Sequence, residues 1–142
     1  MTPVFVDSSA IIRAVLERGL SRATQRHLSS STALVVSRLA LVETSRALLR
    51  ARVDGRVEAD AVREAAEEID GLWSRCEIWE ISRGVCDEAS RIAPTLALRT
   101  LDAIQLATFI VARKRMTTLR LLSTDARMLD AAMRLGLRII KT

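Results

Sequence analysis

The sequence predicts an α/β fold: a three-layer α/β/α sandwich around a mainly parallel central sheet of four to five strands. Short apolar segments of strand length alternate with longer helical segments along the whole chain, and this alternation is typical of a parallel sheet with helices on both faces. The chain has 142 residues and nearly half of them are apolar, which is enough for one hydrophobic core. We therefore expect a single domain over residues 1–142.

The first half of the chain is expected to contain two strands and three helices. Ser37 is placed to N-cap the third of these helices, and the sequence VDG ends it. In chain order, the elements are a strand at 3–6 (PVFV), a turn and helix over 7–19, a short helix at 21–31, a strand at 33–37 (ALVVS) and a helix at 38–52.

The second half continues the alternation. Its first helix is amphipathic with a solvated acidic face, Thr100 is placed to cap the long helix that starts at Leu101, and Gly136 closes the last helix. In chain order, the elements are a helix at 56–73, a strand at 77–81 (EIWEI), a helix at 82–93, a loop at 94–99, a helix at 101–113, a strand at 119–123 (LRLLS), a helix at 124–136 and a strand at 137–141.

The composition excludes several functional classes. No apolar stretch approaches the roughly 18 residues of a membrane span, and the N-terminus lacks the features of a signal peptide, so we expect a cytoplasmic protein that does not enter a membrane. A structural zinc site is excluded, because Cys76, Cys86 and His27 are the only Cys and His residues. Both cysteines are interpreted as small core hydrophobes and His27 as a surface residue.

The charge favours a nucleic-acid partner but does not prove one. The net charge is +5, and only Lys114 and Lys141 of the 22 basic residues are lysines. Arginine suits phosphate recognition, although a genome rich in arginine codons explains the composition equally well. The short basic clusters at residues 46–56 and 113–115 contain no aromatic residue, which argues against recognition by base stacking.

Four acids interrupt otherwise apolar surroundings. Asp7 and Asp125 follow apolar strands, so both belong to the carboxyl edge of the sheet, where ligands bind in such folds. Asp102 lies in the first turn of a mostly apolar helix, and Glu43 lies within another. Each acid alone has a structural explanation, because the three aspartates can cap helices and Glu43 can pair with Arg46.

Together, these four carboxylates would repel one another unless a cation held them. Mg²⁺ and Mn²⁺ take hard oxygen ligands, and the lack of a nearby His or Cys favours these ions. The chemistry expected from such a site is hydrolysis of a phosphodiester by a metal-activated water.

The segments VFVDSSAII, SRLALVETSRAL, TLDAIQLATF and LLSTDARMLDAA resemble the four signature segments of the PIN domain, and more narrowly those of VapC toxins from VapBC toxin–antitoxin pairs. The resemblance covers nearly the whole chain, in order and spacing. It implies an α/β/α sandwich and a metal-dependent endoribonuclease that acts as the toxin of a type II pair. The implied partners are RNA, a small VapB-like antitoxin whose tail covers the toxin, and a second copy of the chain in a homodimer.

The resemblance also implies residue roles. The acids of the family correspond to Asp7, Glu43, Asp102 and Asp125 as catalytic metal ligands for Mg²⁺ or Mn²⁺. The small hydroxyl residues beside them correspond to Ser9 and Ser123, which are expected to support the ligands. The family often has Thr where this chain has Ser123, so the hydroxyl is kept.

Other α/β enzymes fit the sequence less well. A phospho-acceptor receiver domain needs an acidic pair after the first strand, a dehalogenase-type phosphatase needs an acid at position 9, and a P-loop NTPase needs a glycine-rich loop with Lys. None of these is present. The remaining alternative is a non-catalytic, basic α/β module that binds nucleic acid or a partner and whose acids are helix caps.

Overall fold

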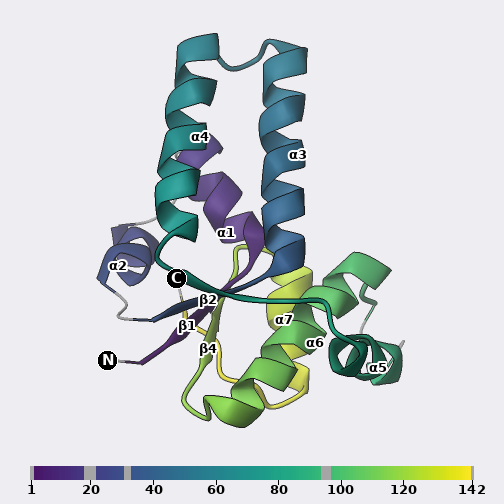
Figure 1. Cartoon of the computed structure of the whole chain (residues 1–142). Helices are drawn as coiled ribbons and strands as arrows, with labels where there is room; N and C mark the ends of the chain where they lie inside the picture. Colours follow the sequence, from purple (N-terminus) through teal and green to yellow (C-terminus); the bar gives the residue numbers. More distant parts are fainter. Residues whose placement is uncertain (1, 18–21, 31–32, 94–96, 142) are drawn as a thin grey trace.

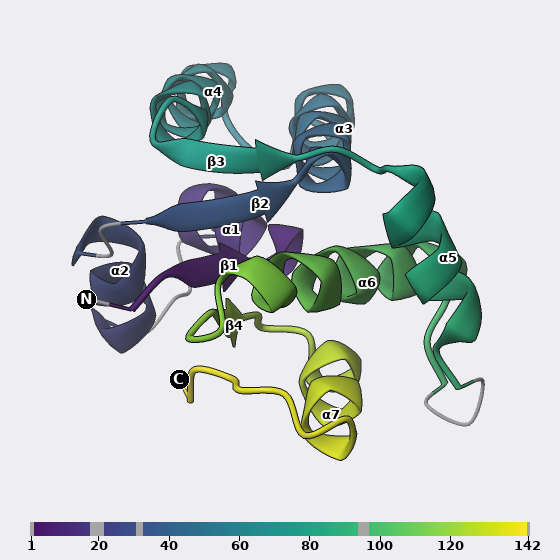
Figure 2. The ribbon, with the colours of Figure 1, turned by 60° about the horizontal axis from the view of Figure 1, so that its bottom comes forward.

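The computed structural model describes residues 2–17, 22–30, 33–93 and 97–141. Its centre is a four-stranded parallel sheet in the order β3-β2-β1-β4, built from β1 (Val4–Val6), β2 (Leu34–Ser37), β3 (Cys76–Trp79) and β4 (Arg120–Leu122). Helices cover both faces (Figures 1 and 2), so the predicted α/β/α sandwich is confirmed.

The helices follow the predicted order. The segment after β1 is helical but changes after α1 to a π-helical stretch, η1. The elements are α1 (Ser8–Ile12), η1 (Arg13–Glu17), α2 (Arg22–Ser30), α3 (Arg38–Asp54), α4 (Ala59–Trp73), α5 (Arg83–Arg91), α6 (Thr100–Arg115) and α7 (Ala126–Arg134). Figure 1 shows α3 and α4 as a helical hairpin that extends beyond the sheet.

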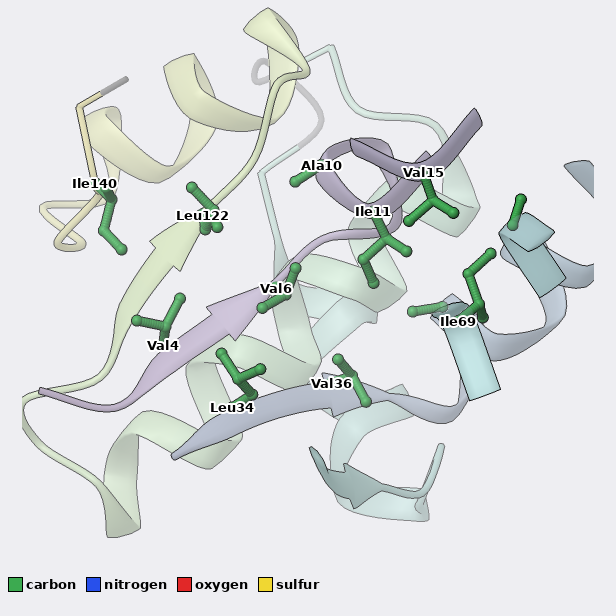
Figure 3. Packing of buried hydrophobic residues seen from close by; sticks show 12 residues of the cluster. Val4, Val6, Ala10, Ile11, Val15, Leu34, Val36, Ile69, Leu122 and Ile140 are labelled. Atoms are coloured by element: carbon green, nitrogen blue, oxygen red, sulfur yellow. The ribbon is translucent and has the colours of Figure 1, made fainter. Parts of the chain in front are cut away.

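The core has two halves, one on each face of the sheet, because successive side chains of a strand point to opposite faces. Val4 and Val6 belong to the cluster with Ile11 of α1 and Ile69 of α4 (Figure 3). Phe5, between them in sequence, belongs to the cluster on the other face. That second cluster includes Leu106, Phe109, Met128 and Ala132 of α6 and α7. Burial of each large apolar side chain contributes about 1.5–3 kcal/mol, so the continuous apolar strands fix both layers of helices.

Two of the predicted helix-end signals are confirmed, whereas the predicted Thr100 cap and the last predicted strand are not. Ser37 caps α3 as predicted, through a 3.1 Å bond from the Leu39 N–H, and Gly136 follows α7 with a φ of 71°. Thr100 does not cap α6: the helix already begins at Thr100, and its N-cap position is Arg99, without a side-chain cap. The segment 137–141 forms only one bridge, Leu121 to Ile139, instead of a full strand.

Of the predictions for His27 and the two cysteines, the one for Cys86 is wrong. Cys86 is exposed on α5, so it is not a core hydrophobe, whereas Cys76 is partly buried. The residues around Cys86 explain this, because the helix SRGVCDEASR buries only Val85 fully. His27, which was predicted at the surface, is partly exposed on α2.

None of the helices in the described ranges is long and apolar enough to cross a membrane. Of the expected loop at 94–99, residues 94–96 lie outside the described residues, and residues 97–99 are neither helix nor strand.

Candidate active site

The candidate site lies at the carboxyl edge of the sheet, where the strand order reverses. The chain runs from β1 outward through β2 to β3, and β4 then lies on the other side of β1. Asp7 directly follows β1, and Asp125 lies three residues after β4. This is the position at which open α/β sheets bind ligands.

Asp7 is the most deeply buried of the four acids, with 4% of its surface exposed. Its Oδ2 accepts hydrogen bonds from the hydroxyls of Ser9 (2.7 Å) and Ser123 (2.8 Å). The backbone N–H of Asp7 donates to the carbonyl of Leu122 (2.9 Å), which joins β1 to β4 at this point. Asp7 occupies the N-cap position of α1 but makes no side-chain cap bond. The cap explanation for Asp7 is therefore wrong.

The pKa of Asp7 rises from 3.8 to about 6, chiefly because the carboxyl is buried and to a smaller extent because of the negative charges of Glu43 and Asp125. The hydrogen bonds from Ser9 and Ser123 oppose this rise. A carboxylate placed so that its ionised form is disfavoured is typical of a functional position.

Ser9, Ser123 and Asp125 form one network with Asp7. The two serine hydroxyls lie 3.2 Å apart, and the Ser9 Oγ also accepts from the Thr124 N–H (3.1 Å). The Ser123 Oγ accepts from the Asp125 N–H (3.1 Å). Asp125 also caps α7, since its Oδ1 accepts from the Arg127 N–H (2.9 Å). Asp125 thus combines the predicted cap with a place at the candidate site.

Glu43 is held by two residues that the sequence analysis did not single out. Its Oε1 accepts hydrogen bonds from the Ser8 hydroxyl (3.1 Å) and from the Gln105 side-chain amide (2.8 Å). No ion pair joins Glu43 to Arg46 among the described residues. One signal was present in the sequence: Gln105 is a polar residue inside an apolar helix, three positions after Asp102.

Asp102 lies in the first turn of α6 and is partly buried. Partial burial raises its pKa, and the charge of Asp125 adds to the rise. The charges of Arg99 and Arg127 lower the pKa, as does a hydrogen bond with the Arg99 backbone. That bond to the backbone of the N-cap residue is half of a capping box. Asp102 therefore helps to cap α6 and also lies near a second acid of the site, Asp125.

An open pocket of about 670 Å³ is lined by three of the four acids, Glu43, Asp102 and Asp125. Because Asp7 interacts electrostatically with Glu43 and Asp125, and Asp102 with Asp125, the four predicted residues lie in one neighbourhood. The pocket is lined by Glu43, Arg99, Thr100, Leu101, Asp102, Asp125 and Arg127.

The donor set fits a hard divalent cation in type, because it offers carboxylate oxygens and neither His nor Cys lines the pocket. Among the described residues, no three Asp, Glu, His or Cys side chains are already close enough to hold a metal ion.

A PIN domain family model matches residues 4–133. Over the whole chain, the protein is similar to Ribonuclease VapC46 of Mycobacterium tuberculosis. The two sequences are 36% identical over 140 residues, which cover 99% of this chain and 98% of that protein.

Solved structures share the fold at low sequence identity. PAE2754 from Pyrobaculum aerophilum superimposes with a TM-score of 0.66 at 20% identity, over 97% of this chain and 83% of that one. A toxin–antitoxin complex from Klebsiella pneumoniae gives 0.66 at 18% identity, over 97% and 96% of the chains. VapBC2 from Rickettsia felis, bound to a promoter DNA fragment, gives 0.67 at 12% identity, over 98% of both chains.

Proposed function

This chain belongs to the PIN-domain family, and from that premise we propose that it is a divalent-metal-dependent endoribonuclease and the toxin of a VapBC-type toxin–antitoxin pair. Residues 1–142 act as one PIN domain in this proposal. The full-length similarity to a VapC ribonuclease supports the activity and the toxin role.

One observation supports the chemistry: Glu43, Asp102 and Asp125 line one pocket, and the buried Asp7 interacts electrostatically with Glu43 and Asp125. We assign Asp7, Glu43, Asp102 and Asp125 as the metal ligands, with Ser9 and Ser123 holding Asp7. Mg²⁺ or Mn²⁺ is the cation, because both ions prefer such oxygen donors.

The reaction is hydrolysis of an RNA phosphodiester, in which a water oxygen bonds to phosphorus, one P–O ester bond breaks, and the leaving oxygen receives a proton. A divalent cation at this site supplies water activation and neutralises phosphate charge. The protein's own contribution is to fix the acids. The serine hydroxyls keep one oxygen of Asp7 occupied, and the pocket beside Asp102 and Asp125 admits the RNA backbone.

The partner that we propose is a small VapB-like antitoxin, with which the toxin forms an inactive complex in the cytoplasm. The fold supports this, because the similar structures include toxin–antitoxin complexes from Klebsiella pneumoniae and Rickettsia felis. The alternative is a non-catalytic binding module, in which Asp102 and Asp125 serve only to cap the N-termini of α6 and α7.

The proposed function predicts metal-dependent RNA cleavage. We expect the purified protein to cut structured RNA with Mg²⁺ or Mn²⁺, to stop in EDTA, and to arrest growth when expressed without its antitoxin. Gel-based cleavage assays and growth curves measure both effects. Asp7→Asn is the inactive control in each. Undiminished cleavage in EDTA, or equal growth arrest by the wild type and Asp7→Asn, would favour the binding module.

Two exposed arginines at the rim of the pocket are suited to the phosphates that flank the cleaved bond. Arg99 and Arg127 line the pocket beside the acids, and a guanidinium group binds phosphate oxygens in pairs. We expect Arg127→Ala to raise KM for RNA about 3–10-fold and to reduce the salt dependence of binding, while kcat changes little. Steady-state kinetics at two salt concentrations test this, with Arg63→Ala on α4 as the control. A fall in kcat at constant KM would contradict the phosphate role.

A homodimer is part of the proposal, and the outer face of α3 is its expected interface. Leu49 is 51% exposed, and Val42 and Val53 on the same helix are 51% and 76% exposed. By contrast, Leu48, Leu72 and Trp73 on α3 and α4 pack partly against the core. Light scattering after gel filtration should give a dimer mass that Leu49→Glu reduces to a monomer mass. A monomeric wild type at high concentration would contradict the dimer.

A further inference from the structure

Glu43 presents its two carboxylate oxygens in very different ways. Oε1 accepts two hydrogen bonds, from Ser8 of α1 (3.1 Å) and from Gln105 of α6 (2.8 Å). Oε2 receives no hydrogen bond from the described residues, and Glu43 is one of the residues that line the pocket. Two donors from two different helices therefore fix the rotation of the carboxylate and leave one oxygen available.

Gln105 makes this contact at a cost to the fold. It is 2% exposed, and its Oε1 has no hydrogen-bond partner among the described residues. The side-chain amide cannot be turned around, because the oxygen would then face the carboxylate of Glu43. A buried polar group with one unsatisfied atom lowers stability, and such an exception calls for an explanation other than stability.

The geometry of Asp7 follows the same pattern. Ser9 and Ser123 both donate to Oδ2, and no described residue donates to Oδ1. Each of the two acids is thus held at one oxygen by two donors. Because Gln105 follows Asp102 by three positions on α6, one face of that helix carries both an acid of the site and the donor that holds another acid.

We propose that Gln105, assisted by Ser8, is a positioning residue that holds Oε1 of Glu43 so that Oε2 faces the cation-binding pocket. This inference rests on the proposed metal-dependent function. Gln105 acts through Glu43 and touches neither substrate nor cation. Groups that orient metal ligands in this way typically contribute about 10–100-fold to metal affinity.

The test measures Mn²⁺ affinity and metal-free stability separately. Gln105→Met keeps the length and volume of the side chain but removes the donor, Gln105→His restores an N–H donor, and Thr108→Val removes a different buried polar group from the same helix. Titration of free Mn²⁺ by electron paramagnetic resonance gives the dissociation constant, and thermal melts in EDTA give the stability.

We expect Gln105→Met to bind Mn²⁺ about 10–100-fold more weakly, with a melting temperature in EDTA equal to or above that of the wild type. Gln105→His should recover most of the affinity, and Thr108→Val should stay within about twofold of the wild type. If Gln105→Met does not fold, Ser8→Ala replaces it, with an expected loss of about 3–10-fold because one of the two donors remains.

Three results would overturn the proposal. The first is a Gln105→Met variant, or a Ser8→Ala variant in its place, that binds Mn²⁺ within about twofold of the wild type. The second is an equal loss in Gln105→Met and Gln105→His, which assigns the effect to packing. The third is an equal loss in Thr108→Val. Wild-type protein that binds no Mn²⁺ would instead contradict the proposed function itself.

Discussion

Asp7→Asn should make the metal-free protein more stable while it removes the nuclease activity. We expect a melting temperature in EDTA at pH 7.5 that is several degrees above that of the wild type. Cleavage should fall about 10²–10⁴-fold, the equivalent of the several kcal/mol that metal coordination supplies to a phosphoryl transfer. The two effects have one cause, because the carboxylate that we propose as a metal ligand is buried and interacts with two other acids.

The direction of the stability change follows from the pKa of Asp7, which burial raises from 3.8 to about 6 in the folded protein. Below pH 3.8 the carboxyl is protonated in both states, so it costs nothing. As pH rises toward 6, the unfolded chain loses the proton while the folded chain keeps it, and the folded state becomes progressively less favourable. Above pH 6 the cost is constant, about 2–3 kcal/mol.

Asparagine escapes this cost because an amide does not ionise, and its oxygen can still accept from Ser9 and Ser123. The gain at pH 7.5 corresponds to roughly 5–10 °C in a domain of this size. Thermal melts at pH 4 and pH 7.5 measure it, and the difference between variant and wild type should nearly vanish at pH 4. Glu64→Gln on the exposed face of α4 is the matched control and should change neither value. A gain that persists unchanged at pH 4 would show that ionisation of Asp7 is not its cause.

The sequence predicted the sheet and the place of the acids because both depend on strong local signals. Val4, Phe5 and Val6 form a continuous apolar run and are all fully buried, as expected for a strand covered on both faces. The position of Asp7 at the carboxyl end of that strand followed at once. The role of Ser123 beside it came instead from the resemblance to the PIN domain, and the structure places its hydroxyl 2.8 Å from Asp7 Oδ2.

The contacts of Glu43 could not be predicted in the same way. Ser8 and Gln105 lie 35 and 62 positions from Glu43 in sequence, and only the packing of α1, α3 and α6 brings them together. The exposure of Cys86 also depends on tertiary structure, because it reflects which side of α5 faces the core. The sequence pattern alone does not distinguish Glu43 or Cys86 from other positions of their helices.

Asp102 is the residue for which the cap and metal explanations compete most closely. The structure supports a contact with the backbone of Arg99 and a repulsive interaction with Asp125. Because the repulsion and the partial burial raise its pKa, removing the charge should not harm the metal-free protein at neutral pH. Asn retains the polar oxygen that a capping position needs. Both explanations therefore predict a melting temperature for Asp102→Asn in EDTA that equals or exceeds that of the wild type.

Added metal separates the two explanations. A cation that binds only the native state stabilises it by RT ln(1 + [L]/Kd), about 2.7 kcal/mol at a concentration of 100 Kd, which corresponds to roughly 8–10 °C here. Wild-type protein and Glu64→Gln should show this full rise with Mn²⁺, whereas Asp102→Asn should lose most of it, because a neutral amide oxygen is a poorer ligand for a hard cation. Melts of the three proteins with and without Mn²⁺ measure the difference. If Asp102→Asn responds to Mn²⁺ as strongly as the wild type, Asp102 only caps α6 and is not a metal ligand. The proposed ligands would then be Asp7, Glu43 and Asp125.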